Sequence, residues 1–182
     1  MRTSLKRAAL ALVLLGWVLL AQGQDKPIQT IANLDVERYM GTWHEIAKYP
    51  NRFQKQCASQ TRAQYLVQTD GSLQVINRCV TAQGETLEAI GQAHQVGGTT
   101  SPKLQVRFAP AWLSWLPWVW GDYWVIDLDP AYQLSAVSDA KRQYLWVLSR
   151  QKKVDAQTYQ ALLTRLAAQG FDLQRLELSP QP

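Results

Sequence analysis

Two short sequences far apart in the chain constrain its fold more than any other feature. Gly41-Thr42-Trp43 opens a run of alternating residue types, and the last such run ends at Arg150. Alternation of this kind indicates β-strands with two different faces. Another backbone can pass close to Gly41, which has no Cβ, and an arginine over a tryptophan ring contributes about 0.5–2 kcal/mol. If the first and last strands are neighbours, Trp43 meets Arg150 and the sheet closes without a free edge.

Between these two sequences the chain alternates repeatedly between strand-like runs and turn residues. Asp70-Gly71 separates two of the runs and is a strong hairpin signal. The pattern predicts an all-β fold, an eight-stranded up-and-down antiparallel β-barrel. The expected strands cover residues 43–49, 60–69, 72–79, 86–95, 103–108, 120–128, 132–138 and 143–149.

Two helical segments are expected beside the strands. Asp35 is a suitable N-cap for a short helical turn within 31–40, and Asp155 for a longer helix that ends before Gly170. The longer helix has a single apolar stripe, which should pack on the outside of the barrel. Its members are Tyr159, Leu162, Leu163, Leu166 and Ala167. Residues 171–178 should return as a short strand.

Several of these segments also carry a family resemblance. Residues 34–49, 127–132 and 144–150 resemble the three short signatures of the lipocalin family, and 70–77 adds to the likeness. The nearer match is the branch of the bacterial outer-membrane lipocalins and apolipoprotein D, and it covers about residues 33–178. The resemblance implies a barrel with a ligand-binding cup, the calyx. It identifies as structural signature residues Gly41, Trp43, Asp127, Tyr132 and Arg150.

The first residues have the pattern of a secretory signal peptide. A basic start is followed by the apolar run Ala8 to Leu20 and by the small residues of Ala21-Gln22-Gly23. We therefore expect cleavage of 1–23 and a single lipocalin domain over 24–182. Cleavage removes three of the 19 basic residues, so the formal charge falls from +5 to 16 − 14 = +2. No cysteine comes directly after the apolar run, so we expect a periplasmic or secreted protein without a lipid anchor. Association with the outer membrane stays open.

The chain has two cysteines, Cys57 and Cys79. An even number of cysteines in an exported chain favours a disulfide, with two buried free thiols as the alternative. Counted from the turn at Asp70-Gly71, Cys57 lies about five residues further out than Cys79. The bond therefore requires the approach to the second strand to fold back or bulge.

Alternation also predicts which residues line the calyx. The inward set is apolar with a few polar groups, which suits an amphipathic ligand. It consists of Glu45, Ala47, Ala63, Tyr65, Val75, Asn77, Val106, Phe108, Tyr123 and Val125, with Arg107 near the rim. Both faces of the fourth strand remain candidates, and plain core packing is the alternative for every member. Glu45 has three alternatives, a ligand head group, an internal arginine or water.

The loop after the fifth strand is unusually apolar. This segment, residues 109–120, is here called the Trp lip and contains Trp112, Trp115 and Trp118. Pro110 and Pro117 argue against one continuous helix. Chain direction places the loop at the open end of the barrel, and exposed apolar patches usually mark binding sites. We expect it to grip a ligand tail or touch a bilayer, whereas a plug folded into the barrel is the alternative.

Together these features predict a non-catalytic protein that binds and transports or stores a small hydrophobic or amphipathic ligand. The resemblance implies a fatty acid or lysophospholipid and a role in outer-membrane lipid maintenance. We expect no catalytic residue, cofactor, metal or nucleic-acid partner, since His44 and His94 are the only histidines. A protein-interaction module or dimer that uses the Trp lip, with a plugged calyx, is the alternative. A lipocalin-type isomerase is a weaker one, and monomer and homodimer both stay open.

Overall fold

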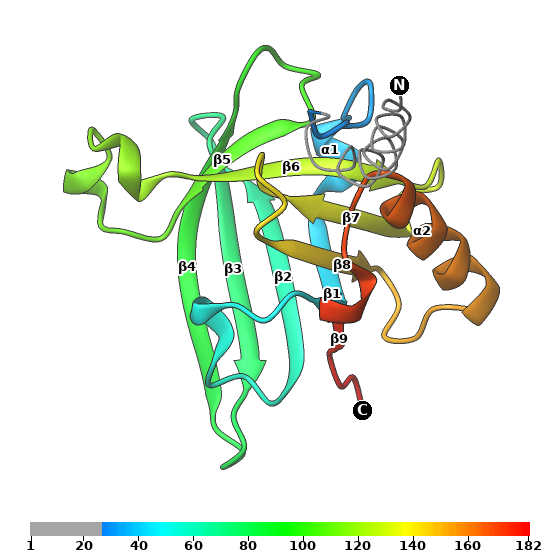
Figure 1. The fold of residues 1–182 in the computed structure, drawn as a ribbon. Helices are drawn as coiled ribbons and strands as arrows, with labels where there is room; N and C mark the ends of the chain where they lie inside the picture. Colours follow the sequence, from blue (N-terminus) through cyan, green and yellow to red (C-terminus); the bar gives the residue numbers. More distant parts are fainter. Residues whose placement is uncertain (1–26) are drawn as a thin grey trace, which may run out of the picture.

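The strands form one antiparallel sheet that closes on itself. The computed structural model describes residues 27–182, and the signal peptide predicted over 1–23 lies outside them. The strand order is β2-β3-β4-β5-β6-β7-β8-β1-β9, and a further β1–β2 pairing closes the ring (Figure 1). The predicted eight-stranded up-and-down barrel is therefore confirmed, with β9 added beside β1. The strands are β1 (Gly41–Lys48), β2 (Ser59–Val67), β3 (Leu73–Val80), β4 (Thr86–Gln95), β5 (Lys103–Arg107), β6 (Gly121–Leu128), β7 (Leu134–Ser138), β8 (Leu145–Ser149) and β9 (Glu177–Leu178).

The two predicted helices form and begin at the predicted caps. Helix α1 (Val36–Tyr39) begins where the amide of Arg38 donates to Asp35 Oδ1 at 3.2 Å. Helix α2 (Ala156–Ala168) begins where the amide of Thr158 donates to Asp155 Oδ1 at 2.9 Å. Short 3-10 turns occupy Arg52–Gln54, Ala111–Leu113, Pro117–Val119 and Leu173–Arg175.

The strand predicted over 171–178 is wrong over most of its length. Only Glu177–Leu178 pairs with β1, because Leu173–Arg175 coils into a 3-10 turn. Phe171 is buried, and its ring packs edge-on against Tyr49 with the ring centroids 6.3 Å apart. This segment therefore anchors the end of α2 to the barrel wall.

Apolar side chains gather in two separate cores. One fills the barrel interior and includes Trp43, Tyr65 and Val125. The other lies between the barrel wall and α2, where Leu162 and Leu166 are fully buried. Figure 1 shows α2 lying against the outside of the barrel, as the single apolar stripe predicted.

Two β-bulges change which residues face the interior. In the β1–β8 ladder Glu45 pairs with Leu148 but Ala47 pairs with Val147, so one extra residue lies in β1. Such an insertion moves the following side chain to the other face. Ala47 consequently belongs to the core beneath α2, and its predicted place in the calyx is wrong.

The second bulge lies in β6 and moves Asp127 to the outer surface. Val125 pairs with Val137, whereas Asp127 pairs with Ala136. The Asp127 carboxylate accepts two hydrogen bonds from Arg165 of α2, at 2.7 and 2.9 Å. Among the signature residues, Asp127 thus holds the outer helix and does not join the cluster around Trp43.

The two ends of the barrel differ in how they are covered. Helix α1 covers the end where β1 begins and β8 finishes, which is the closed floor. The other end is the mouth. There β4 extends beyond β5, because β5 pairs only with Gln92–Gln95. Figure 1 shows β2, β3 and β4 continuing past the end of β5, so the wall of the barrel is lower on the β5 side.

The predicted disulfide between Cys57 and Cys79 is present. The required bulge is present too, because the β2–β3 register shifts between Ser59 and Arg62, where Gln60 adopts a φ of +54°. The segment between β1 and β2, residues 49–58, is here called the mouth loop. The left-handed conformation of Gln60 shortens the path from this loop into β2 and brings Cys57 level with Cys79. The alternative with two free thiols is therefore wrong.

Candidate functional site

The floor of the barrel is built around Trp43 and Arg150. The Arg150 guanidinium lies 4.0 Å above the centroid of the buried Trp43 ring, and Trp43 Nε1 donates to the Tyr39 carbonyl at 2.8 Å. Arg150 also donates to the carbonyls of Thr42, Arg38 and Tyr39 at 3.0, 2.9 and 3.1 Å. These bonds satisfy carbonyls at the C-terminal end of α1 and at the start of β1, and they fasten the floor to the end of β8.

Gly41 is required where Arg150 crosses the first strand. Its φ of +94° is a conformation that side-chain-bearing residues rarely adopt. A Cβ at this position would lie 3.2 Å from Arg150 Nη1. The signature residues Gly41, Trp43 and Arg150 therefore work as one contact, as the sequence predicted. Tyr132 joins them through its carbonyl, which accepts from Arg150 Nε at 3.3 Å.

A chain of hydroxyl groups crosses the barrel above this floor. Tyr65 and Tyr123 hydroxyls are 2.7 Å apart, Tyr123 and Tyr39 are 3.1 Å apart, and Tyr39 and Ser135 are 3.2 Å apart. Ser135 Oγ in turn donates to the Asp127 carbonyl at 3.2 Å. Burial raises the pKa of all three tyrosines, so they stay protonated. The chain satisfies these polar groups internally, and the floor needs no ligand to do so.

Side chains almost fill the lower half of the barrel. The cavity enclosed there has a volume of only about 10 Å³ open to the centre of a water molecule, which is room for about one water. Its lining is Leu34, Val36, Tyr39, Met40, Tyr65, Leu73, Val75, Ala93, Leu104, Val106 and Tyr123. The lower half of the barrel therefore has no room for an acyl chain.

The inner wall of the upper half becomes exposed toward the mouth. Val75 pairs with Gly91 and Asn77 with Ala89, so the inward face of β4 is the one that carries both Gly91 and Ala89. Val75 and Gly91 are buried, whereas Asn77 is half-buried and Ala89 is exposed. The choice between the two faces of the fourth strand is thereby settled, and its inner surface is accessible from solvent.

Phe108 lies on this exposed part of the inner wall. A Cβ added to Gly91 would lie 2.8 Å from Phe108 Cδ1, so the phenyl ring occupies the space that a side chain at 91 would need. The residue is nevertheless 43% exposed. The ring of Phe108 is therefore half-exposed at the mouth, on the side of the barrel where β5 is shorter than β4.

Most of the predicted calyx residues lie on the inner wall. Those that do so are Glu45, Ala63, Tyr65, Val75, Asn77, Val106, Phe108, Tyr123 and Val125. Ala47 is on the outside, as described above. Arg107 is also misplaced in the prediction, because it pairs with Gln92 and faces away from Val106, beneath the Trp lip.

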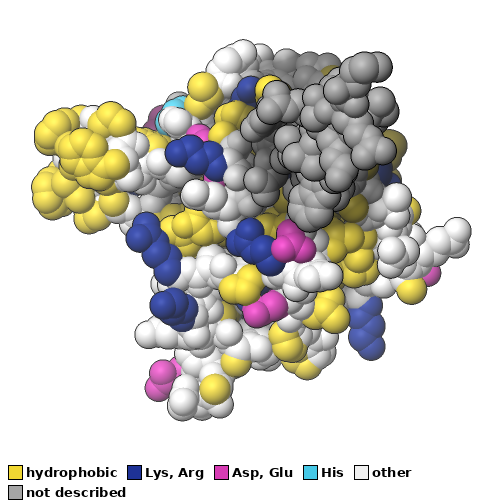
Figure 2. Space-filling view, viewed as in Figure 1, with side chains coloured by type: hydrophobic (Ala, Val, Ile, Leu, Met, Phe, Trp, Pro, Cys, Tyr) yellow, Lys and Arg dark blue, Asp and Glu magenta, His cyan; other side chains and the backbone are white. Residues whose placement is uncertain are grey.

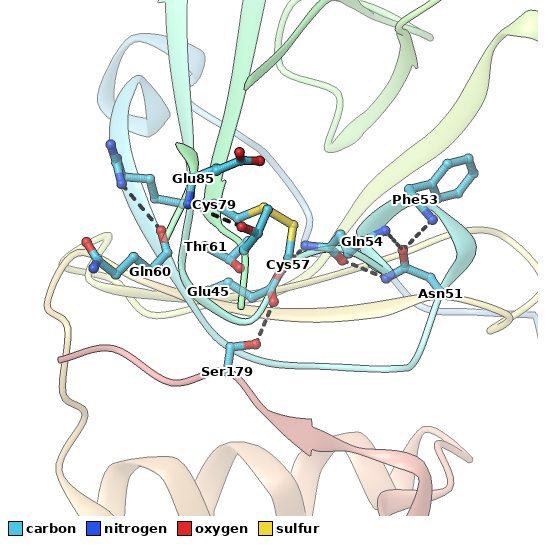
Figure 3. The surroundings of a disulfide bond; sticks show 12 residues. Glu45, Asn51, Phe53, Gln54, Cys57, Gln60, Thr61, Cys79, Glu85 and Ser179 are labelled. Carbon is cyan, nitrogen blue, oxygen red and sulfur yellow. Dashed lines mark hydrogen bonds between the residues drawn. A yellow bond between two sulfur atoms is a disulfide. The ribbon is translucent and has the colours of Figure 1, made fainter. Parts of the chain in front are cut away.

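Glu45 is buried and both of its carboxylate oxygens are occupied. Ser179 Oγ donates to Oε1 and Gln54 Nε2 donates to Oε2, each at 2.5 Å (Figure 3). Gln181 Nε2 bridges the carbonyls of Glu45 and Thr61 at 2.9 and 2.8 Å. The partner of Glu45 is therefore the mouth loop and the C-terminal segment, and no internal arginine meets it in the described part of the chain.

The sequence analysis missed two residues near the mouth, Trp146 of β8 and Gln54 of the mouth loop. Trp146 packs against the interior core, and its Nε1 donates to Gln54 Oε1 at 3.0 Å. Gln54 therefore connects the mouth loop, Glu45 and the wall. The alternating pattern of β8 could have identified Trp146, because Leu148 and Trp146 share a face. Nothing in the sequence marks Gln54, which lies in an irregular loop.

We expect the stability difference between Glu45→Gln and the wild type to depend on pH. Burial raises the pKa of Glu45 above its ordinary value of 4.5, against the opposing hydrogen bonds from Ser179 and Gln54. The stability contributed by protonated Glu45 is therefore complete below that ordinary value and is lost as the pH rises through the raised folded-state pKa. The glutamine of Glu45→Gln stays neutral at every pH. The free energy of unfolding of the variant, relative to that of the wild type, should therefore rise from about pH 4 to about pH 7.

Urea unfolding of both proteins across that pH range measures this difference. Glu37→Gln, which removes an exposed carboxylate from α1, is the matched control for the change in charge. A difference for Glu45→Gln that stays constant or shrinks with rising pH would contradict the expectation.

The Trp lip projects from the barrel as an exposed apolar knob. Trp112, Trp115 and Trp118 are 73%, 76% and 77% exposed. Two 3-10 turns shape the loop, and Trp120 Nε1 closes it by donating to the Ser114 carbonyl at 2.8 Å. Figure 2 shows a cluster of hydrophobic side chains at the left, where the loop projects in Figure 1. The alternative in which this loop folds back as a plug is therefore wrong.

The described residues offer few groups for covalent or metal chemistry. Within residues 27–182 no group of three or more His, Cys, Asp or Glu side chains is placed to hold a metal ion. Both cysteines of the chain are joined in the disulfide, so neither provides a free thiol nucleophile. What the described residues do offer is a largely apolar inner wall that ends at the half-exposed ring of Phe108.

Comparisons with known proteins agree with this architecture. The family model of the lipocalin-like domain matches residues 34–181. The chain belongs to the lipocalin family. Temperature-induced lipocalin-1 of Arabidopsis thaliana is 37% identical over 160 residues, which are 87% of this chain and 85% of the relative. The outer membrane lipoprotein Blc of Escherichia coli (strain K12) is 33% identical over 156 residues, 85% of this chain and 84% of Blc.

Solved structures support the fold independently. The crystal structure of Per a 4, a major allergen from cockroaches, has a TM-score of 0.66 and 20% identity, and the match covers 88% of this chain and 97% of that one. At such low identity the likeness concerns the lipocalin fold alone. Together with the family match, it confirms the resemblance that the signature residues indicated. Lipocalins in general bind small hydrophobic ligands.

Proposed function

We propose that this lipocalin binds a single-chain amphipathic lipid, either a fatty acid or a lysophospholipid, in the upper half of its barrel. It transports or stores this lipid without catalysing a reaction. One observation carries the proposal, the inner wall that passes from buried Val75 to exposed Ala89 beside the half-exposed ring of Phe108. An acyl chain that lies along this wall would cover it, while the polar head stays at the mouth.

The energetics of such a complex are favourable. Burial of one methylene contributes about 0.8 kcal/mol, so ten methylenes contribute about 8 kcal/mol. Association costs at least about 4 kcal/mol in lost motion, so ten methylenes alone leave about 4 kcal/mol, a millimolar affinity. About five further buried methylenes, which a longer acyl chain supplies, bring the affinity to the micromolar range when the cup is largely preformed. The closed disulfide and the hydrogen-bonded floor support such a preformed cup.

We further propose export, with removal of 1–23 and a lipocalin domain over 24–182, and a role in maintaining outer-membrane lipids. The signal-like sequence and the likeness to the outer membrane lipoprotein Blc support this location. None of the helices within 27–182 has the length and apolar character needed to cross a bilayer. Contact with the membrane is proposed to occur at its surface, through the Trp lip.

The double variant Trp112→Ser with Trp115→Ser tests the contact with the membrane. Indole rings prefer the boundary between water and hydrocarbon, so their loss should weaken binding to lipid vesicles by at least about tenfold. Vesicle sedimentation measures this affinity. The exposed aromatic Phe53, in the mouth loop away from the Trp lip, provides the matched control Phe53→Ser. Unchanged vesicle binding and unchanged ligand affinity in the double variant would refute the role of the lip.

Neighbouring substitutions on β4 test the binding cup. Ala89 lies on the inner wall and Ile90, the next residue, is exposed on the outer wall. Ala89→Trp should fill the upper half of the cup and weaken the binding of lysophospholipid by about tenfold or more, as a steric block of a buried chain. Ile90→Trp adds a similar ring outside and should bind as the wild type does. Titration calorimetry measures both, and equal affinities would place the ligand elsewhere.

The ligand itself is identified from the protein as its own host makes it. Native mass spectrometry without detergent should show about one acyl lipid on each chain, which solvent extraction then names. A protein that arrives empty and takes up no added lysophospholipid would contradict the proposal. That outcome would favour the alternative, an interaction module or dimer that uses the Trp lip while the filled floor leaves no room for a ligand.

A further inference from the structure

Arg107, at the end of β5, is a buried cation without an anionic partner. The residue is only 4% exposed. The ion pairs formed within residues 27–182 join Lys48 to Glu177, Arg78 to Glu88 and Arg165 to Asp127, and none involves Arg107. A charge taken out of water without a counter-charge is unfavourable. A ligand that supplies the counter-charge would remove this penalty.

The hydrogen bonds of Arg107 leave one edge of its guanidinium incompletely used. Nη1 donates to the Ala109 carbonyl, and Nη2 donates to Gln92 Oε1 at 2.6 Å. Nε is buried and has no hydrogen-bond partner. The Nε and Nη2 hydrogens point in the same direction and form the edge that binds carboxylate and phosphate oxygens in pairs. Only the neutral amide of Gln92, an exposed residue, occupies part of that edge.

This edge lies at the base of the Trp lip. Ala109, which holds Nη1, is the first residue of the loop, and the Arg107 guanidinium lies 5.2 Å from the centroid of the Trp120 ring at its end. His94 also packs edge-on against Trp120, with the two ring centroids 4.6 Å apart. The buried cation is therefore next to the segment that exposes three indole rings to solvent.

We propose that Arg107 binds the phosphate of an anionic membrane phospholipid while the Trp lip contacts the bilayer. Gln92 swings into solvent, and two phosphate oxygens accept from Nε and Nη2 of Arg107. Nη1 stays on the Ala109 carbonyl and holds the loop in place. This inference rests on the proposed membrane contact, but it assigns the recognition of the head group to a residue outside the calyx.

Vesicle sedimentation with the full chain tests this site. Arg107→Gln should lower the affinity for vesicles that contain phosphatidylglycerol by about tenfold or more, the value of a charge-assisted bond pair, and leave weaker binding to pure phosphatidylcholine unchanged. Arg107→Lys keeps the charge but not the paired donors, so its affinity for vesicles that contain phosphatidylglycerol should lie between that of the wild type and that of Arg107→Gln. Lys153→Gln, which removes an exposed charge at the closed end, is the matched control.

Gln92→Ala separates a binding role from a structural one. If Gln92 only competes with the lipid for Arg107, its removal should raise the affinity for phosphatidylglycerol vesicles a few-fold. If the Arg107–Gln92 bond merely stiffens the base of the loop, the affinity should fall for both kinds of vesicle, and the proposal is overturned. Equal losses on both vesicles in Arg107→Gln would overturn it as well.

A soluble lipid distinguishes this site from the calyx and from the membrane contact. Dihexanoyl phosphatidylglycerol, kept below its micelle concentration, should shift the Arg107 Nε–H resonance in the wild type. Inorganic phosphate alone should do so only weakly, and no shift with the soluble lipid would refute the head-group site. Fatty-acid titration of Arg107→Gln in solution should match the wild type. If the calyx does not bind lipid, the fatty-acid titration of the wild type will show no binding, whereas the shift of the Arg107 resonance with the soluble lipid will remain.

Discussion

Trp43→Ala is expected to lower the free energy of unfolding by about 3–5 kcal/mol, the usual cost of removing a buried tryptophan. The ring is fully buried in the interior core, stacks under Arg150 and donates a hydrogen bond to the Tyr39 carbonyl. Its loss opens a cavity at the floor and leaves the Tyr39 carbonyl with only its hydrogen bond from Arg150. Urea unfolding followed by circular dichroism measures the change.

Trp112→Ala provides the matched control, because it removes the same atoms from an exposed position in the Trp lip. Its effect should stay within about 0.5 kcal/mol. A loss of less than about 1 kcal/mol in Trp43→Ala would be typical of a surface substitution and would contradict the central place given to Trp43.

Removal of the disulfide by Cys57→Ser with Cys79→Ser is expected to cost about 3 kcal/mol. The bond closes a loop with a sequence separation of 22 residues, and loops of this length stabilise mainly by restricting the unfolded chain. It also ties the mouth loop, which carries Gln54, to β3. Thermal and urea unfolding of the oxidised wild type and the double variant give the difference.

The reduced wild type should unfold with the same midpoint as the double variant, which separates loss of the bond from any effect of serine. If the double variant were as stable as the oxidised wild type, the denatured chain would have to be compact enough already to keep positions 57 and 79 together.

The sequence was sufficient to predict the elements that repeat with a regular period. The alternating runs, the Asp70-Gly71 turn and the helix stripe gave the strands and α2 within a few residues. Because antiparallel strands reverse direction at each turn, the same reading placed Trp43 and Arg150 together and put the Trp lip at the mouth. Those predictions rest on period and chain direction, which single sequences carry well.

The misplacement of Ala47 has a clear physical origin, since it follows from a local break in the period. Alternation fails after a bulge because one extra residue reverses every later side chain in the strand. Ala47 and Asp127 follow such bulges and therefore face α2. Bulges have no fixed sequence signal when no glycine is involved, and neither of these positions has one beside it in its strand.

Contacts made by irregular segments could not be predicted from the sequence either. Gln54 lies in a loop and Ser179 follows the last strand, yet both bind the buried carboxylate of Glu45. The unpartnered Nε of Arg107 lies where the β4–β5 pairing ends, at the pair formed by Gln92 and Arg107. Such contacts arise from the three-dimensional path of the backbone, and only coordinates reveal them.

The pairing of β1 has a consequence for the order in which the chain can fold. This strand is bonded to β2, β8 and β9, and the Gln181 side chain still bonds to Glu45. If the chain is exported as proposed and emerges from the membrane with its N-terminus first, it presents β1 long before β8 exists. Closure of the barrel must wait for β8, about a hundred residues later in the chain, and such non-local pairing makes folding slow. Until then β1 and β2 form an open edge, which a chaperone on the far side of the membrane would have to shield.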